Sequence, residues 1–215
     1  KDKAAKLVFD GSLKLVVGIY EVHWATDRLA LAYHEMPTGA YSNACVGVKS
    51  ASAILEKTLP DDLKAMAKLG AARCALFVGD LVHAEALAKQ SVVILEGILG
   101  KTGVSTGSAH VVLAEVLRRR GDIAAATKEL AGARAATNKG GLFEFTRLVA
   151  AIDEQQALNL NVELAKEDAV ELRRLSIERL ARVFGDRHPS VAVARVDLAV
   201  ALAAIGQQRE AREVL

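Results

Sequence analysis

Pairs of glycine and alanine recur along the chain at a nearly constant spacing. The pairs, each separated by five residues, are Gly79 with Ala84, Gly121 with Ala126, and Gly206 with Ala211. The first two glycines lie 42 residues apart and the last two 85 apart, which leaves room for one further unit around Ala169. An earlier and weaker unit is placed by Gly39 and Ala44. A period of this size indicates a repeat protein in which each unit packs on its neighbours.

Apolar residues on both sides of Gly121 recur at steps of three and four, which predicts two helices in each unit. These residues are Leu113, Ala114 and Leu117 before the glycine, and Ala126, Leu130 and Ala133 after it. Gly121 lies where the first helix must end and the chain reverse, which favours a positive φ, and Asp122 can cap the second helix. Alanines let the two helix backbones approach closely. Each unit is therefore predicted to be a helical hairpin.

The composition of the chain agrees with an all-α fold. Ala, Leu and Val carry most of the apolar half, while only 4% of residues are aromatic and three are proline. Such a mixture suits closely packed helices better than sheets. The predicted helices span about 3–17, 21–36, 41–57, 61–78, 81–99, 106–120, 122–137, 142–159, 162–183, 189–205 and 207–215. No stretch alternates apolar and polar residues long enough to require a strand.

The predicted units fall into two parts. Residues 1–60 are expected to hold N-terminal helices with one degenerate repeat, and residues 61–215 the repeats of about 42 residues. The chain opens on Lys1 and closes on Leu215 inside a predicted helix. We therefore expect the last repeat to be truncated and the sequence to be part of something longer.

The last unit carries a family resemblance. The residues that look like the tetratricopeptide pattern are Leu198, Ala199, Leu202, Gly206, Ala211 and Leu215. The segment 175–211, LSIERLARVFGDRHPSVAVARVDLAVALAAIGQQREA, resembles the 42-residue repeats of kinesin light chains, with Gly185 and His188 in the loop between units. An offset of 85 superposes Ser91 on Ser176. The resemblance implies a right-handed solenoid of antiparallel helix pairs, a tetratricopeptide-like superhelix of four to five units.

Charge and cysteine content bear on partners and location. The net charge is +2 with both signs interspersed, so no global field favours nucleic acid or an acidic membrane surface. No apolar run reaches about 18 residues without a charge, so membrane insertion is not expected. Cys45 and Cys74 lie among small or apolar residues and are predicted to be reduced core side chains. These features favour a cytoplasmic location.

No catalytic constellation, cofactor site or metal site is predicted. The five histidines lie on separate predicted elements, without a second ligand at metal-binding spacing. Gly100, Lys101 and Thr102 are not a phosphate loop, because Leu95 stands where the motif needs a glycine. The serines lack the glycine-flanked turn of a nucleophile. The chain is therefore predicted not to be an enzyme.

The resemblance implies a concave groove lined by the first helix of each unit. The partner-binding residues that it implies are Tyr33, Arg73, Phe77, Glu115, Arg118, Arg119 and Asp197. Arginine can bind carboxylates with two hydrogen bonds, so the expected partner is an acidic or amphipathic peptide or protein. The alternative for the run of arginines is a solvated helix end, where cations favour the helix dipole.

One departure from the family limits the inference. Kinesin light chains resemble each other in a pair of groove asparagines, and this chain has Val111-Val112 and Val196-Asp197 at the matching places. Kinesin-type cargo binding is therefore not carried over.

The leading function is a protein interaction scaffold or adaptor. A second alternative is the helical sensor or substrate-guiding portion of a larger multidomain regulator or enzyme, which the full-length sequence would decide. A third is assembly into homo-oligomers through apolar end helices, since an uncapped solenoid end is apolar.

Overall fold

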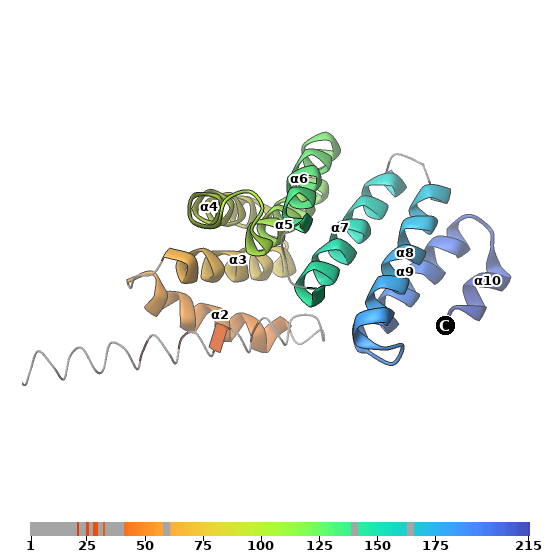
Figure 1. Cartoon of the computed structure of the whole chain (residues 1–215), viewed down its shortest axis with the longest axis horizontal. Helices are drawn as coiled ribbons and strands as arrows, with labels where there is room; N and C mark the ends of the chain where they lie inside the picture. The colour runs from red at the N-terminus through yellow and green to blue at the C-terminus, as the bar shows by residue number, and fades with distance from the viewer. Residues whose placement is uncertain are drawn as a thin grey trace, which may run out of the picture.

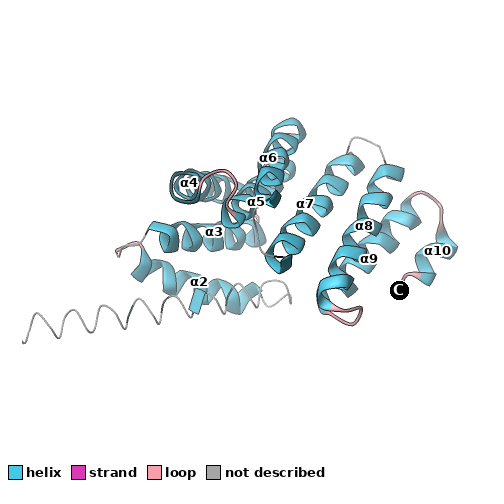
Figure 2. Cartoon of the chain, in the orientation of Figure 1, coloured by secondary structure: helices cyan, strands magenta, loops and turns pink. Residues whose placement is uncertain are grey.

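The computed structural model describes residues 41–57, 61–138, 142–162 and 166–215, together with Glu21, Ala25, Arg28, Leu29 and Ala32. All regular structure in these residues is helical (Figures 1 and 2). The α-helices are α2 (Tyr41–Leu55), α3 (Asp61–Val78), α4 (Leu81–Leu99), α5 (Val104–Arg119), α6 (Ile123–Ala135), α7 (Leu142–Val162), α8 (Lys166–Phe184), α9 (Pro189–Ala204) and α10 (Gln208–Glu213). A short 3-10 helix, η2 (Ala136–Asn138), follows α6. These bounds agree with the predicted ranges to within a few residues.

The helices pack as successive antiparallel pairs. Helix α3 packs on α4, α5 on α6, α7 on α8, and α9 on α10, and each pair also contacts the next. The pairs follow one another along the array, from α2 at one end to α10 at the other (Figure 1). The chain is a right-handed solenoid of antiparallel helix pairs, which confirms the predicted fold class.

The same turn ends the first helix of three pairs. Its glycines, with φ between +82° and +87°, are Gly79, Gly121 and Gly206. After α5, the amide N–H of Gly121 donates to the carbonyl of Arg118 at 2.9 Å, and that of Asp122 donates to Leu117 at 3.0 Å. Any other residue would be strained at this φ. The Asp122 carboxylate then accepts from the N–H of Ala125 at 3.0 Å, which caps α6 as predicted.

The alanines of the repeat lie in the helix contacts. All five are buried: Ala44, Ala84, Ala126, Ala169 and Ala211. The buried apolar residues form three clusters, one across α3 to α7, one where α2 and α3 meet the residues before them, and one across α8 to α10. This division is what a solenoid predicts, because each unit shares a core only with its neighbours.

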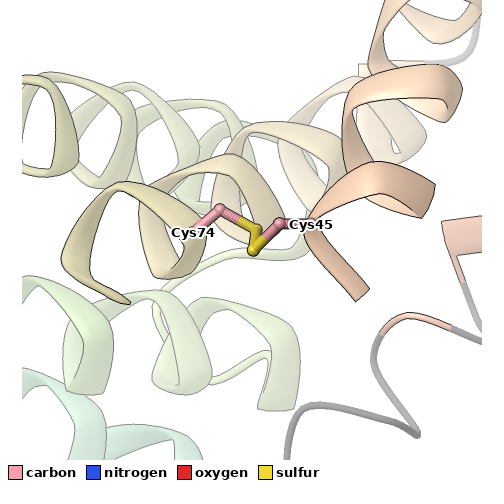
Figure 3. The surroundings of a disulfide bond; sticks show 2 residues. All are labelled: Cys45 and Cys74. Atoms are coloured by element: carbon pink, nitrogen blue, oxygen red, sulfur yellow. A yellow bond between two sulfur atoms is a disulfide. The ribbon is translucent and has the colours of Figure 1, made fainter. Parts of the chain in front are cut away.

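A disulfide bond joins Cys45 of α2 to Cys74 of α3 (Figure 3). The prediction of two reduced core thiols was therefore wrong. The two cysteines are 29 residues apart in the sequence, and no local pattern indicates that they meet. Packing of α2 on α3 brings their Cα atoms to 5.5 Å, which is within the usual range for a disulfide. The bond fastens α2 to the first helix of the next pair.

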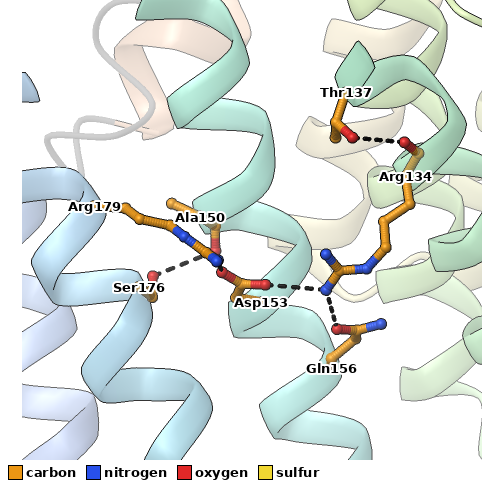
Figure 4. Close-up of polar contacts among 7 residues, drawn as sticks. All are labelled: Arg134, Thr137, Ala150, Asp153, Gln156, Ser176 and Arg179. Carbon is orange, nitrogen blue, oxygen red and sulfur yellow. Dashed lines mark hydrogen bonds and ion pairs between the residues drawn. The ribbon is translucent and has the colours of Figure 1, made fainter.

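Two serines make the same contact 85 residues apart. The hydroxyl of Ser91, on α4, donates to the carbonyl of Ala65 at 2.9 Å. The hydroxyl of Ser176, on α8, donates to the carbonyl of Ala150 at 3.3 Å (Figure 4). Each serine is buried and bonds to the residue 26 positions before it. The offset of 85 found in the sequence therefore relates equivalent places in two helix pairs.

A buried carboxylate connects three helices. Asp153 of α7 is only 1% exposed. Arg134 of α6 donates to its Oδ1 at 3.1 Å, and Arg179 of α8 donates to its Oδ2 (Figure 4). Arg134 also donates to the side-chain oxygen of Gln156 at 2.5 Å. A buried carboxylate is unfavourable without such partners, so the two guanidinium groups help to set α6, α7 and α8 against one another.

The division into residues 1–60 and 61–215 stays a prediction. Most of the first part, including the predicted helix 3–17, lies outside the described residues. Within the part that is described, no helix is long and apolar enough to cross a membrane.

Candidate functional site

A cavity of about 400 Å³ opens where the first helices of three successive pairs meet. It lies among α3, α5 and α7, and Tyr41 of α2 closes one side. Four residues of the predicted groove line it: Arg73, Phe77, Glu115 and Arg119. We refer to this space as the N-terminal cavity.

Two other predicted site residues, Asp197 and Arg118, lie elsewhere. Asp197, on α9, lines a second cavity. Arg118 is half-buried and lines neither cavity. Tyr33 lies outside the described residues. The structure therefore brings together four of the seven predicted residues.

An aromatic pair forms one wall of the N-terminal cavity. The rings of Tyr41 and Phe77 stack with their centroids 4.8 Å apart and their planes 7° from parallel. Phe77 is nevertheless 52% exposed, so its ring offers apolar surface to a partner. Val111 and Val112 are buried and form an apolar floor at the place where kinesin light chains resemble each other in two asparagines. The cavity thus combines an apolar floor with charged walls.

Two of the charged groups that line this cavity, Arg119 and Glu115, are paired with each other. Arg119 lies 2.6 Å from a carboxylate oxygen of Glu115 and donates to the carbonyl of Leu76, on α3, at 3.2 Å. Arg120, the next residue, turns away and pairs with Glu85 of α4. These two arginines contact neighbouring helices and are also exposed, so the alternative of a solvated helix end stays a prediction for them.

The second cavity, of about 200 Å³, lies among α7, α8 and α9. Glu154 and Asp197 bring carboxylates to it, and Leu180, Phe184 and Val193 bring apolar surface. Glu154 lines both cavities, so the two are neighbours along the array. We refer to this space as the C-terminal cavity.

Burial raises the pKa of both carboxyl groups in the C-terminal cavity. For Glu154, burial is the largest influence, and the charge of Asp197 raises its pKa further, while Arg173 opposes the change. For Asp197, burial again raises the pKa and Arg173 again opposes it. Removal from water disfavours the charged form of a carboxyl group, so both groups are incompletely compensated.

Arg173 is the cation beneath these carboxylates. It comes from α8 and is only 4% exposed, with Nη2 3.4 Å from Oε1 of Glu154. Its Nε and Nη1 have no hydrogen-bond partner among the residues that the structure describes. Neither Glu154 nor Arg173 was predicted, because the repeat resemblance is weak between Gly140 and Asn161, where Glu154 lies, and Arg173 belongs to the second helix of its pair.

A buried histidine with two acidic neighbours lies away from both cavities. His110 of α5 is buried, with Nδ1 2.7 Å from a carboxylate oxygen of Glu129 on α6 and Nε2 3.4 Å from Glu96 on α4. Burial acts most strongly and would lower the pKa of His110, but the hydrogen bond and charge of Glu129, together with Glu96, raise the pKa above its ordinary 6.5. When it is protonated, the imidazole therefore pairs with carboxylates of both neighbouring helices, α4 and α6.

We expect this histidine to make the stability of the array depend on pH. Because its pKa is higher in the folded chain than in the unfolded chain, its contribution is fully present below pH 6.5 and is lost as the pH rises through the raised pKa. Chemical unfolding between pH 6 and 9 should show a fall in stability that the His110→Gln variant lacks. Parallel pH profiles for the two proteins would contradict this assignment.

Metal binding has no geometric support in the part of the chain that is described. No group of three or more His, Cys, Asp or Glu side chains there is placed to hold a metal ion. The absence of a cofactor stays a prediction.

Comparison with known proteins identifies solved structures with a similar fold. No known family profile matches the sequence, and no curated protein matches it. One similar solved structure is a variant of nearly identical TPR-like repeats from a Podosopora anserina protein assigned as a kinesin light chain. It is 23% identical to this chain, with a TM-score of 0.60, and the match covers 91% of this chain and 92% of that one. A second structure of these Podosopora anserina repeats gives 23% identity, a TM-score of 0.58, and coverage of 90% and 92%.

A further match is more distant in sequence. BtubC (BKLC) from P. vanneervenii is 12% identical, with a TM-score of 0.62 and coverage of 92% of this chain and 86% of that one. At these identities the likeness is one of fold. The chain has a tetratricopeptide-like repeat fold, and the solved structures that it matches include repeats of the kinesin light chain type.

Proposed function

We propose that the protein is an interaction scaffold or adaptor that binds a peptide or protein partner along the face lined by α3, α5, α7 and α9. The N-terminal cavity is the observation that carries this proposal. It crosses successive helix pairs and offers an exposed aromatic ring, an apolar floor and arginines. Tetratricopeptide-like folds are generally used for protein interaction, and such a cavity suits a partner with both apolar and charged groups.

The predicted binding residues take different parts in this proposal. Arg73 and Arg119 would receive an acidic group of the partner, and Phe77 an apolar one, while Asp197 would act at the neighbouring cavity. Glu115 would hold Arg119 in place through their ion pair. Two further predicted residues complete the proposed set: Arg118, which lines neither cavity, and Tyr33, which lies outside the described residues.

Adjacent arginines provide a matched test of the binding face. Peptides that bind the wild type would be selected from a random library of 12-residue peptides. The selected peptides would then be titrated against the wild type, Arg119→Gln and Arg120→Gln. We expect Arg119→Gln to weaken binding of the selected peptides about tenfold, the size of one lost hydrogen bond to a charged group. Arg120→Gln should bind as the wild type does, because that side chain faces Glu85 on α4.

Thermal unfolding of each variant would be measured alongside, since Arg119 also contacts the carbonyl of Leu76. Equal binding by both variants, with both folded, would rule out the proposed face. A library that binds to none of the three proteins would rule out peptide binding itself.

Three broader predictions accompany this function. We propose a non-catalytic role, in keeping with the usual use of such folds. Self-association through an apolar end of the array remains an alternative use of the same fold. The predicted cytoplasmic location depended partly on reduced thiols, and the bond between Cys45 and Cys74 counts against it, because disulfides persist mainly in oxidising compartments.

A further inference from the structure

The C-terminal cavity has the size of one side chain. Its volume is about 200 Å³, and a protein cavity of roughly 150 Å³ already holds a benzene molecule. Leu180 and Phe184 of α8 and Val193 of α9 supply apolar surface, and Glu154 and Asp197 bring two carboxylates to the lining. This volume suits a single projecting group of a partner.

Negative charge is in excess in this cavity. Arg173 does not line the cavity but lies 3.4 Å from Glu154, measured from Nη2 to Oε1. Asp197 makes no hydrogen bond or ion pair with any residue that the structure describes. Arg118 of α5 attracts Glu154 more weakly and interacts with Glu115. The raised pKa values of both carboxyl groups agree with this incomplete compensation.

The neighbouring face of α9 is apolar and exposed. Val193, Val196 and Val200 lie three and four residues apart, so they share one side of the helix with Asp197, and each is about half or more exposed. An aliphatic side chain or stem would lose water-exposed surface against these valines. The surroundings of Asp197 therefore favour a group that is apolar along its length and positive at its end.

We propose that the C-terminal cavity receives a lysine or arginine side chain of the partner, with its alkyl stem against Phe184 and Val193 and its cationic head between Glu154 and Asp197. Long basic side chains commonly bury their stems in this way while the charge finds a polar group. The inference rests on the proposed function and names the partner chemistry at this end. The partner would present an acidic group to Arg119 and a basic one here.

An acidic occupant fits the same cavity poorly. The free Nε and Nη1 atoms of Arg173 could in principle attract an anion. Arg173 is buried, however, and does not line the cavity. A carboxylate entering it would meet Glu154 and Asp197 first, and like charges placed together oppose binding.

The test uses peptide sublibraries with one fixed position. Random 12-residue peptides would carry Lys, Arg, Ala or Glu at a central position, and binding to the full chain would be titrated by fluorescence polarisation. We expect the Lys and Arg sublibraries to bind about tenfold more tightly than the Glu sublibrary. Asp197→Asn should remove most of this preference, and Asp197→Lys should reverse it in favour of Glu. Asp197 is chosen because it makes no hydrogen bond or ion pair with a described residue, so its substitution removes no such contact.

The control variant is Glu178→Gln, which removes an exposed carboxylate of α8 that does not line the cavity. It should keep the preference for Lys and Arg, and circular dichroism would check that every variant is folded. Binding without a Lys or Arg preference, or a preference unchanged in Asp197→Asn, overturns the inference and leaves the proposed function standing. If no sublibrary binds the wild type, the proposed function fails, and this inference fails with it.

Discussion

Replacing both Arg134 and Arg179 by methionine is expected to lower the free energy of unfolding by about 3–5 kcal/mol. Methionine keeps much of the length of the arginine stem but has no charge. The carboxylate of Asp153, 1% exposed, would then remain buried without either cation. Because α6, α7 and α8 all meet at this carboxylate, we expect urea unfolding to begin in the middle of the array. Urea titration followed by circular dichroism would measure the loss.

Two controls separate this effect from a general loss of charge. Arg182→Met removes a guanidinium whose ion pair with Glu178 is exposed on both sides, and such pairs contribute less than about 1 kcal/mol. Asp153→Asn removes the buried charge itself and leaves Arg134 and Arg179, which solvent reaches, so it should cost less than the double variant. A double variant as stable as Arg182→Met would show that Asp153 does not depend on its two cations.

Reduction of the disulfide is expected to destabilise the N-terminal end of the array by about 3–4 kcal/mol. This figure follows from the chain entropy released when a link across 29 residues is opened. The effect should be local, because each unit of a solenoid is stabilised by its neighbours. Hydrogen exchange of α2 amides should therefore accelerate in dithiothreitol, while that of α9 should not change.

The serine double variant provides the matched control. Cys45→Ser with Cys74→Ser should exchange as fast as the reduced wild type and should not respond to dithiothreitol. Tyr41 lies one turn before Cys45, and Phe77 three residues after Cys74, so the stacked rings of the N-terminal cavity should loosen as well. Equal exchange of α2 with and without the reductant would contradict a stabilising role for this bond.

The repeat architecture could be predicted from the sequence because it depends on residues that lie close together along the chain. Gly121 requires a positive φ to close the turn after α5, and Asp122 supplies the cap of α6 a residue later. Ala126 must be small because a helix of the same pair lies against it, and it is fully buried. Each of these requirements involves residues a few positions apart, so the periodic pattern predicted the helix pairs and the fold.

Only part of the candidate site could be predicted from the sequence. The groove helices could be chosen from the resemblance, which placed Arg73, Phe77 and Glu115 on walls that the structure brings to one cavity. Glu154 was not predicted because the repeat pattern is weak along α7. Arg173 was missed because it belongs to the second helix of its pair, whereas the resemblance implies a groove lined by the first helices.

The sequence by itself determined the helices, their turns and the order in which they pair, since these depend on backbone conformation and short-range periodicity. Only the tertiary structure decided that Cys45 bonds to Cys74, that Asp153 lies between two arginines, and that Glu154 and Asp197 face a common cavity. The reason is that such contacts depend on how far each pair is rotated against the next. That rotation results from packing between many residues that are distant in the sequence. It therefore cannot be predicted from the spacing of residues along the chain.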